Sequence, residues 1–223
     1  MKGYARDRTA RAGQESKSGE AGRAKAVRRM NAERKNNMDL VTGIKERRSI
    51  RKFQDRKVPH EVIGEIVNVA AYAPSWKNTQ IARYIVVEDP EQIAAIATEE
   101  CTLGFKYNIR TMAAAPALVL LTMVKGRSGF EKDGSYTTLK GDRWEMFDAG
   151  IAAQTFCLAA HEKGVGTVIL GIFDENKVAE IVDIPEGQQL AAIIAMGYPA
   201  DGEVTAPPRK TAEQLLSFAG QNE

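Results

Sequence analysis

Three arginines and one serine stand within five consecutive positions of this 223-residue chain, Arg47-Arg48-Ser49-Ile50-Arg51. Guanidinium groups bind phosphate through paired, charge-assisted hydrogen bonds, and a serine hydroxyl adds a neutral one. The cluster follows a helix-like run over residues 40–46, and at a helix end it can hold a phosphorylated cofactor. A short basic run is also typical of a solvated turn, so the other motifs must decide between these interpretations.

A second stretch with ligand-binding groups is the segment 73–80. It breaks a helical pattern with proline, serine, asparagine and glutamine, and this composition predicts a loop of hydrogen-bonding side chains. Ser75 and Asn78 are also common turn-capping residues, which is the alternative explanation for both.

The composition is typical of a globular chain rather than of a membrane protein or a disulfide-rich one. Apolar residues make up 43% of the sequence, which is ordinary for a domain with one core. No apolar run approaches the roughly 20 residues that a membrane helix needs. Cys101 and Cys157 match no disulfide or metal spacing, and with only His60 and His161 besides, we expect no metal site. A reduced, cytoplasmic setting is therefore expected.

Charge divides the sequence near residue 37. Residues 1–37 hold 11 of the 31 basic and 4 of the 29 acidic residues, a net charge of +7, whereas residues 38–223 carry −5. We therefore expect a basic N-terminal extension (1–37) and a mildly acidic domain (38–223). Such an extension can contact nucleic acid or another anionic surface, but it has almost nothing to bury. The composition favours a flexible arm, and a nucleic-acid partner is not expected.

Hydrophobic periodicity predicts both helices and strands after residue 38. Asp39 can cap a first helix, over 40–46, that turns Leu40, Val41 and Ile44 toward the core. A continuous apolar run over 117–124 indicates a strand covered on both faces. The other predicted helices are 59–73, 90–100, 145–162 (the longest, rich in small residues), 175–182 and a last turn at 213–218; the other predicted strands are 83–88, 167–172 and 190–196.

Taken together, the motifs resemble those of the flavin-dependent nitroreductase family from about residue 38 to residue 216. No single motif is specific, but their number, order and spacing are. The resemblance rests, in order, on 47–53 (Arg-Arg-Ser-Ile-Arg-Lys-Phe), Ala73-Pro74-Ser75 with Asn78 and Gln80, Asp148-Ala149-Gly150-Ile151-Ala152-Ala153-Gln154, Gly164-Val165-Gly166-Thr167 leading to Gly171-Ile172-Phe173-Asp174, Gly197-Tyr198-Pro199 and Pro208-Arg209-Lys210.

The resemblance implies an α+β domain of three layers, in which helices flank a central, mostly antiparallel sheet. It also implies an intertwined homodimer that binds one FMN per chain at the dimer interface. The polar loop 125–142 interrupts the packed elements, and loops of that length inside a domain are often lids or binding loops. From its place in the family pattern we expect it to cover the flavin and select the electron acceptor.

The same resemblance assigns the FMN contacts. The cluster 47–51 and the basic pair near the C-terminus would hold the phosphate and ribityl chain, with Arg51 near the flavin N1 and C2 carbonyl. The backbone at Gly171 and Ile172 would face N5, while the loop 73–80 would reach the flavin of the other subunit. The implied cofactor-binding residues are Arg47, Arg48, Ser49, Arg51, Pro74, Ser75, Asn78, Gln80, Arg110, Leu170, Gly171, Ile172, Arg209 and Lys210.

Two positions depart from the family pattern. Many members continue Asn-x-Gln with Pro-Trp, whereas Ile81-Ala82 stands here. Ile172 replaces a second glycine and narrows the space beside N5. For Gly171 itself, an ordinary turn at a strand end is the alternative explanation.

The resemblance implies an FMN-dependent oxidoreductase that passes electrons from NADH or NADPH to a small organic acceptor by a ping-pong mechanism. The flavin would carry the chemistry, so no catalytic side chain is assigned. No Gly-x-Gly-x-x-Gly follows a predicted strand, so a nicotinamide would share the flavin pocket. The alternatives are a flavin-binding or sensing protein with little turnover, and a relative of the reductive dehalogenases.

Overall fold

The computed structural model describes residues 38–200, 202 and 204–220 of the chain. The chain divides into two units, Met1–Thr42 and Gly43–Glu223, and the second contains the sheet and the candidate site. The predicted basic extension, 1–37, lies outside the described residues. Within the described part of the chain, none of the helices has the length and apolar character needed to cross a membrane.

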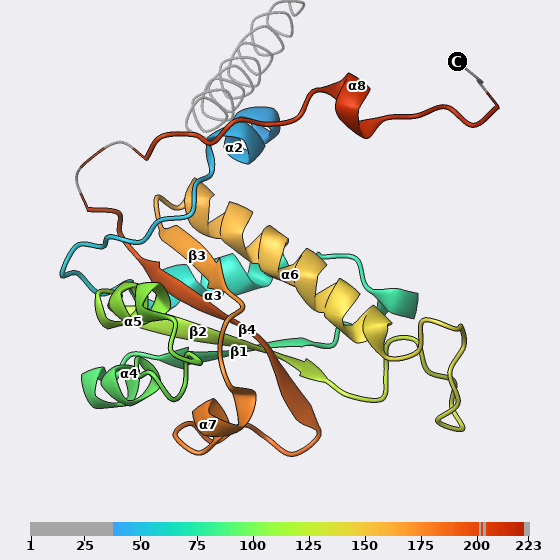
Figure 1. Ribbon diagram of the computed structural model, residues 1–223, viewed down its shortest axis with the longest axis horizontal. Coiled ribbons are helices and arrows are strands. Elements are labelled where there is room, and N and C mark those ends of the chain that lie inside the picture. Colours follow the sequence, from blue (N-terminus) through green and yellow to red (C-terminus); the bar gives the residue numbers. More distant parts are fainter. Residues whose placement is uncertain (1–37, 201, 203, 221–223) are drawn as a thin grey trace, which may run out of the picture. The chain divides into compact units, whose positions relative to one another are not determined.

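A four-stranded antiparallel sheet forms the middle of the described domain (Figure 1). In space, β2 and β4 are central, β1 is one edge and β3 is the opposite edge. The apolar run of β2 is buried from Ala117 to Met123, as predicted for a strand covered on both faces. The strands are β1 (Ala82–Val87), β2 (Ala117–Val124), β3 (Gly166–Leu170) and β4 (Gln188–Gly197).

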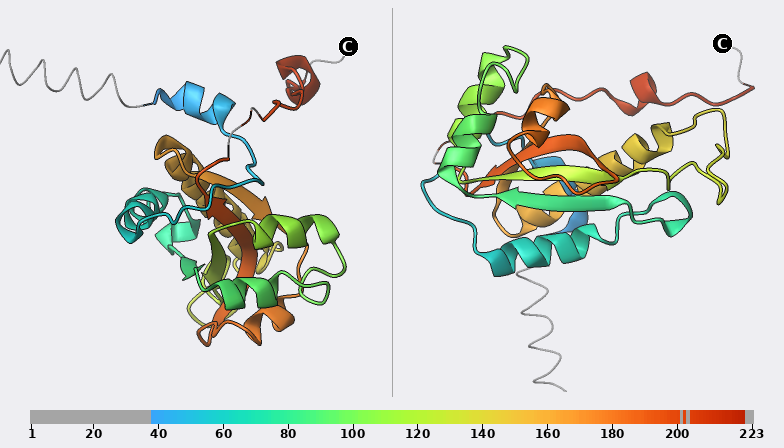
Figure 2. Two further views of the ribbon diagram at one scale, coloured as in Figure 1. Left: turned by 90° about the vertical axis from the view of Figure 1, so that its left-hand side faces the viewer. Right: turned by 90° about the horizontal axis from the view of Figure 1, so that it is seen from below.

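Helices cover both faces of the sheet and give the domain three layers (Figures 1 and 2). Because side chains alternate along β2, Val119 belongs to the core under α3 and α6, whereas Leu120 belongs to the core under α4, α5 and α7. This arrangement confirms the α+β fold with a helix-flanked antiparallel sheet. The helices are α3 (His60–Ala70) and α6 (Arg143–Glu162) on one face, and α4 (Pro90–Ile96), α5 (Lys106–Ala113) and α7 (Glu175–Ala179) on the other.

Local signals explain where several helices begin and end. Asp89 caps α4 by accepting from the Glu91 N–H at 3.0 Å, and Asp174 caps α7 in the same way. α6 ends before Gly164, whose φ of 71° suits glycine at a helix C-terminus. The small residues of α6, among them Ala153, are buried where the helix packs on α3 and on the sheet.

One expectation about the helices was wrong, and one helix was not predicted. α2 (Leu40–Glu46) forms as predicted, with Asp39 accepting from the Thr42 N–H at 3.1 Å, but its apolar residues are exposed rather than turned into the core. α5 was not predicted, because the buried face of this short helix carries polar residues such as Asn108 beside the apolar Met112. A last short helix, α8 (Ala212–Leu215), covers part of the predicted turn at 213–218.

Candidate functional site

The arginine cluster lies in an extended segment beside the edge strand β3. Ser49 forms a parallel bridge with Thr167, and the Ile50 backbone N–H donates to the Thr167 carbonyl oxygen at 2.9 Å. Ile50 packs so closely on Gly166 that a Cβ at this glycine would lie 2.8 Å from the isoleucine side chain. The first residues of β3 therefore fix the place of the cluster, and Gly166 has to lack a side chain.

Arg47 has a buried donor without a partner. Its Nε atom is shielded from solvent and has no hydrogen-bond acceptor among the described residues. The guanidinium lies near the last turn of α6, where burial lowers the pKa of His161 and the charge of Arg47 lowers it further. A buried donor on a permanent cation is unfavourable unless a ligand accepts from it. This donor therefore indicates a place for an anionic group.

Arg48 and Arg51 are engaged differently from Arg47. Nη1 of Arg48 donates to the backbone oxygens of Lys45 (2.5 Å) and Arg47 (2.9 Å), so this guanidinium caps the end of α2. Nη1 of Arg51 donates to a backbone oxygen of the cluster at 3.2 Å, and its guanidinium carbon lies 5.6 Å from the centre of the Tyr107 ring. Arg51 is otherwise exposed, and its remaining donors can reach a ligand.

α5 connects the cluster to the turn that follows β3. Tyr107 of this helix lies beside Arg51, and the next residue, the buried Asn108, donates from Nδ2 to the Ile172 carbonyl oxygen at 3.2 Å. A Cβ at Gly171 would meet no atom within 4 Å, so the backbone of this turn has open space beside it. Ile172 is 43% exposed. The turn is thus held from one side and open on the other.

A pocket of about 350 Å³ lies between the cluster and the chain that follows β4. It combines a serine hydroxyl, an arginine and an aromatic ring with small and apolar groups, which suits a ligand that is partly polar and partly flat. Its lining includes Ser49, Arg51, Tyr107, Pro199, Val204 and Thr205.

Four of the predicted residues do not line this pocket. Leu170 ends β3 and is buried in the core under α5, while Arg110 is exposed on α5 itself. Arg209 and Lys210 are exposed, and Nη1 of Arg209 donates to a carbonyl oxygen two residues earlier at 3.4 Å. In the described chain neither residue of this basic pair forms a hydrogen bond with the arginine cluster.

The loop 73–80 lies before β1 and contains the other predicted residues. A one-turn 3₁₀ helix, η1 (Trp76–Asn78), shapes it, and Ser75 Oγ accepts from the Gln80 N–H at 2.9 Å, so this serine closes the turn. Lys77, Asn78 and Gln80 have left-handed φ angles of 45°, 56° and 48°. A largely apolar pocket of about 380 Å³ adjoins the loop; its lining includes Val67, Ala70, Pro74, Ser75, Gln80, Tyr84 and Asp148.

The two groups of candidate residues belong to opposite edges of one sheet. The cluster 47–51 borders β3, whereas the loop 73–80 leads into β1. Three strand spacings of about 4.8 Å separate these edges. Among the described residues no hydrogen bond or ion pair joins the loop 73–80 to the cluster 47–51.

Sequence reasoning missed four polar residues that hold these segments in place. Asn108 fixes the turn after β3, and Thr79, Ser128 and Asp148 form a hydrogen-bonded chain that joins the loop 73–80 to α6. The motif 148–154 contained Asp148, an acidic residue on the mostly apolar buried face of α6, which was the available signal. Ser128 lies in a polar loop and gave none.

The fold and the site together define a class of α+β proteins whose helix-flanked antiparallel sheet has an arginine cluster at one edge and a polar loop at the other. The chain belongs to the nitroreductase family, whose family model matches residues 44–198. The chain is 33% identical over 172 residues to a Methanothermobacter thermautotrophicus protein provisionally named NADH dehydrogenase/NAD(P)H nitroreductase. That alignment covers 75% of this chain and 81% of the other protein.

Further relatives extend the comparison. The chain is 29% identical over 181 residues to the iodotyrosine deiodinase of Thermotoga neapolitana, which covers 78% of this chain and 96% of that protein. A solved structure of a nitroreductase family protein from Clostridium novyi NT has a TM-score of 0.63 at 27% identity, covering 74% of this chain and 87% of that one. Oxidized iodotyrosine deiodinase, solved with FMN and 3-iodo-L-tyrosine, has a TM-score of 0.66 at 25% identity. That match covers 81% of this chain and 100% of the other chain.

Proposed function

We propose that the chain is an FMN-dependent oxidoreductase that passes electrons from NADH or NADPH to a small organic acceptor, such as a nitroaromatic or a quinone. The observation that carries the proposal is the buried, unpaired Nε of Arg47, two residues from the Ser49 hydroxyl. A charged donor held in this state suits a phosphate, which accepts several strong hydrogen bonds.

The residues present fit FMN at both of its ends. Arg47 and Ser49 offer a charged and a neutral donor for the phosphate. The open backbone beside Gly171 gives a flat ring room to approach, because a Cβ there would have no neighbour within 4 Å. A related structure with FMN bound supports the same choice of ligand.

The protein would supply position and electrostatics. Bound FMN would supply the electron transfer itself. Arg51, exposed beside Tyr107, would stabilise the negative charge that the ring gains on reduction. Asn108 would keep the turn at Gly171 in place by holding the Ile172 carbonyl oxygen. The loop 73–80 would orient the flavin from its other side.

A homodimer would complete the site. The loop and the cluster lie at opposite edges of the sheet, and we infer that the loop of one copy meets the cluster of the other. The exposed apolar side chains of α6, Met146 and Phe147, supply surface that such an association can bury.

One pocket would serve donor and acceptor in turn. The sequence has no separate dinucleotide fingerprint, so the nicotinamide would bind over the flavin and leave before the acceptor arrives. This order gives a ping-pong mechanism. The loop 125–142 would influence which acceptor enters.

A second candidate function is reductive dehalogenation of a halogenated phenol. Two observations favour it: the relatives named iodotyrosine deiodinase and the solved deiodinase with an iodinated tyrosine bound. The exposed Tyr107, beside Arg51, would give a phenolic substrate an aromatic neighbour.

The test begins with the cofactor and ends with the acceptor. Protein purified without added flavin should be yellow and release FMN on heating, and NADH or NADPH should bleach it rapidly without oxygen. A turnover screen over nitroaromatics, quinones and iodophenols then separates the two candidate reactions. Colourless protein that ignores added FMN would refute the proposal, and a flavin that neither nucleotide bleaches would favour a binding or sensing protein.

A further inference from the structure

The backbone of the loop 73–80 is held in an unusual shape. Three of its non-glycine residues, Lys77, Asn78 and Gln80, adopt left-handed φ angles. Residues with side chains disfavour this region, and they stay there only where surrounding contacts over-determine the conformation. Specific contacts must therefore hold this loop in its conformation.

The first contact comes from α6. Asp148 is 4% exposed, and its Oδ2 accepts from the Trp76 backbone N–H at 2.9 Å and from the Ser128 hydroxyl at 2.6 Å. Within the described residues Asp148 forms no ion pair, so these hydrogen bonds are what compensates its burial. One carboxylate thus holds the loop 73–80 and the loop 125–142 at the same time.

The direction of the hydrogen bonds joins the two loops directly. A carboxylate accepts hydrogen bonds and donates none, so the single proton of the Ser128 hydroxyl points to Asp148. Ser128 Oγ also lies 2.7 Å from Thr79 Oγ1, and it must therefore accept from Thr79. Ser128 is fully buried, which protects this chain from exchange with water. We call the chain from Thr79 through Ser128 to Asp148 the hydroxyl chain.

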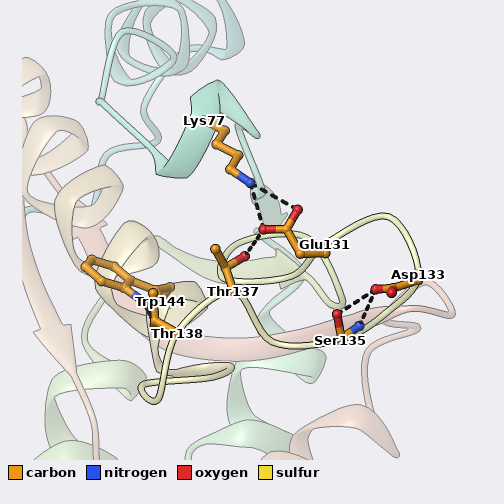
Figure 3. Close-up of polar contacts among 7 residues, drawn as sticks. All are labelled: Lys77, Glu131, Asp133, Ser135, Thr137, Thr138 and Trp144. Atoms are coloured by element: carbon orange, nitrogen blue, oxygen red, sulfur yellow. Dashed lines mark hydrogen bonds and ion pairs between the residues drawn. The ribbon is translucent and has the colours of Figure 1, made fainter.

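A second, exposed link also joins the two loops. Lys77 Nζ lies 3.2 Å from Glu131 Oε1, and the Thr137 hydroxyl donates to the same oxygen at 2.7 Å (Figure 3). The Thr137 hydrogen bond and the Lys77 charge lower the pKa of Glu131. Exposed ion pairs contribute little by themselves. The buried hydroxyl chain is therefore the stronger link.

The base of the loop 125–142 is tightly packed. Gly129 has φ +87°, and a Cβ there would lie 2.4 Å from the Gly141 carbonyl oxygen and 2.9 Å from Trp144 Cδ1. The Trp144 ring in turn lies 4.8 Å from the ring of Trp76, centre to centre. Near its base, the loop 125–142 is thus part of the support of the loop 73–80.

We propose that Asp148, Ser128 and Thr79 are positioning residues that fix the loop 73–80 in its ligand-contacting shape. Through them the loop 125–142 acts on flavin binding. The first part, the shape of the loop, concerns the protein without any ligand. The second part, the effect on flavin binding, rests on the proposed function. Both parts predict that breaking the hydroxyl chain loosens the loop without removing any group that touches the flavin.

The experiment interrupts the hydroxyl chain by removing one hydroxyl group. Thr79→Val keeps the shape and removes the donor, Thr79→Ser keeps the donor, and Ser128→Ala breaks the same contact from the other loop. Thr155→Val is the matched control, because Thr155 donates only within α6, to the Ile151 carbonyl oxygen. Hydrogen exchange of residues 75–80 is measured on the full chain with and without FMN, together with the FMN Kd and the visible circular dichroism of the bound flavin.

We expect exchange at 75–80 to accelerate about 2- to 10-fold in Thr79→Val, the range for one net hydrogen bond, and by at least as much in Ser128→Ala, which also removes the donor to Asp148. Thr79→Ser and Thr155→Val should match wild type. FMN Kd should rise by a similar factor in the first two, with an altered flavin dichroism. Exchange unchanged in both Thr79→Val and Ser128→Ala would overturn the first part. Faster exchange with an unchanged FMN Kd would overturn the second, and a wild-type chain that exchanges as expected but binds no FMN would refute the proposed function instead.

Discussion

Ser49 and Thr167 lie side by side in a parallel bridge, although the sheet that they border is antiparallel throughout. The bridge places the arginine cluster at the start of β3, and Gly171 follows the end of the same strand. From Thr167 to Gly171 the chain rises by about 13 Å at roughly 3.3 Å per residue. Ser49 and the open turn therefore lie about one strand length apart, and we expect a ligand with a phosphate and a flat ring to span this distance.

The two neighbouring arginines should contribute unequally to FMN affinity. Arg47 has a buried donor without a partner among the described residues, whereas Nη1 of Arg48 donates to backbone oxygens at the end of α2. Arg47→Ala should therefore weaken binding by about 1.5–3 kcal/mol, the value of a hydrogen bond to a charged group. Arg48→Ala should weaken it less. Titration of the apo protein with FMN, followed by flavin fluorescence, gives both values.

Riboflavin provides the control for this comparison. Because it lacks the phosphate, its affinity should hardly change in Arg47→Ala. Equal losses for FMN in the two variants would show that the unpaired Nε does not mark the phosphate site.

Arg51 should set the reduction potential of the bound flavin. A cation near the ring stabilises its anionic reduced form more than its neutral oxidised form. Two unit charges 4 Å apart near a protein surface interact by about 4 kcal/mol, and the exposure of Arg51 should remove at least half of this. Since about 1.4 kcal/mol corresponds to about 30 mV for a two-electron couple, Arg51→Met should make the potential more negative by some tens of millivolts.

A dye-linked redox titration measures this shift. Arg56→Met is a suitable control, because Arg56 also lies over an aromatic ring, that of Tyr198 at 4.0 Å, but outside the cluster. If the reduction potential of both variants equals that of wild type, Arg51 does not act on the flavin.

The pKa of His161 should change when the phosphate of FMN binds. Burial and the nearby Arg47 lower its pKa, whereas a hydrogen bond and the charge of Glu88 raise the pKa of the exposed His60. The chain has only these two histidines, so their ring protons are easily distinguished by NMR. A phosphate beside Arg47 offsets its charge, so FMN should raise the His161 pKa and leave that of His60 unchanged. Riboflavin should move neither.

The same shift predicts how stability depends on pH. A histidine with a lowered pKa in the folded state resists protonation there, while the unfolded chain takes up the proton near its ordinary pKa of 6.5. Stability from this source is present above pH 6.5 and is lost as the pH falls through the lowered value. His161→Gln should flatten this part of the curve of unfolding free energy against pH. An unchanged slope would show that His161 titrates alike in both states.

The sequence predicted those elements whose apolar residues are covered within the chain. The strand at 117–124 and the helix at 145–162 carry patterns that burial in one domain explains, and both are found. α5 was missed because Asn108 is buried for a polar contact with Ile172, which no periodicity reveals. The exposed apolar face of α2 shows the converse limit, because an apolar stripe predicts burial without saying what covers it.

The candidate site was also predicted only in part from the sequence. Residue types and their spacing selected the cluster 47–51 and the loop 73–80. Which arginine keeps an unpaired donor depends on the local path of the backbone, as the different contacts of Arg47 and Arg48 show. Asp148 meets Ser128 and Trp76 across long sequence separations, and polar loops carry no pattern that announces such contacts.

The last prediction concerns the second copy of the chain. If the cluster of one chain and the loop 73–80 of the other enclose each flavin, Arg47→Ala and Gln80→Ala damage different halves of the site. Each variant alone should then lose FMN affinity at all of its sites. In a mixed dimer, however, one site carries both substitutions and the other carries none. Random exchange of chains in a symmetric dimer makes about a quarter of all sites intact.

Mixing the two defective proteins, unfolding them together and refolding them should therefore restore tight FMN binding at about a quarter of the sites. Each variant refolded by itself is the control and should recover nothing. Sedimentation should show dimers at micromolar concentration in every sample. A mixture that recovers no tight sites would place the loop and the cluster around the same chain's ligand, and an FMN-loaded monomer would contradict the shared site directly. The arrangement at opposite edges of the sheet, β3 and β1, makes recovery the expected result.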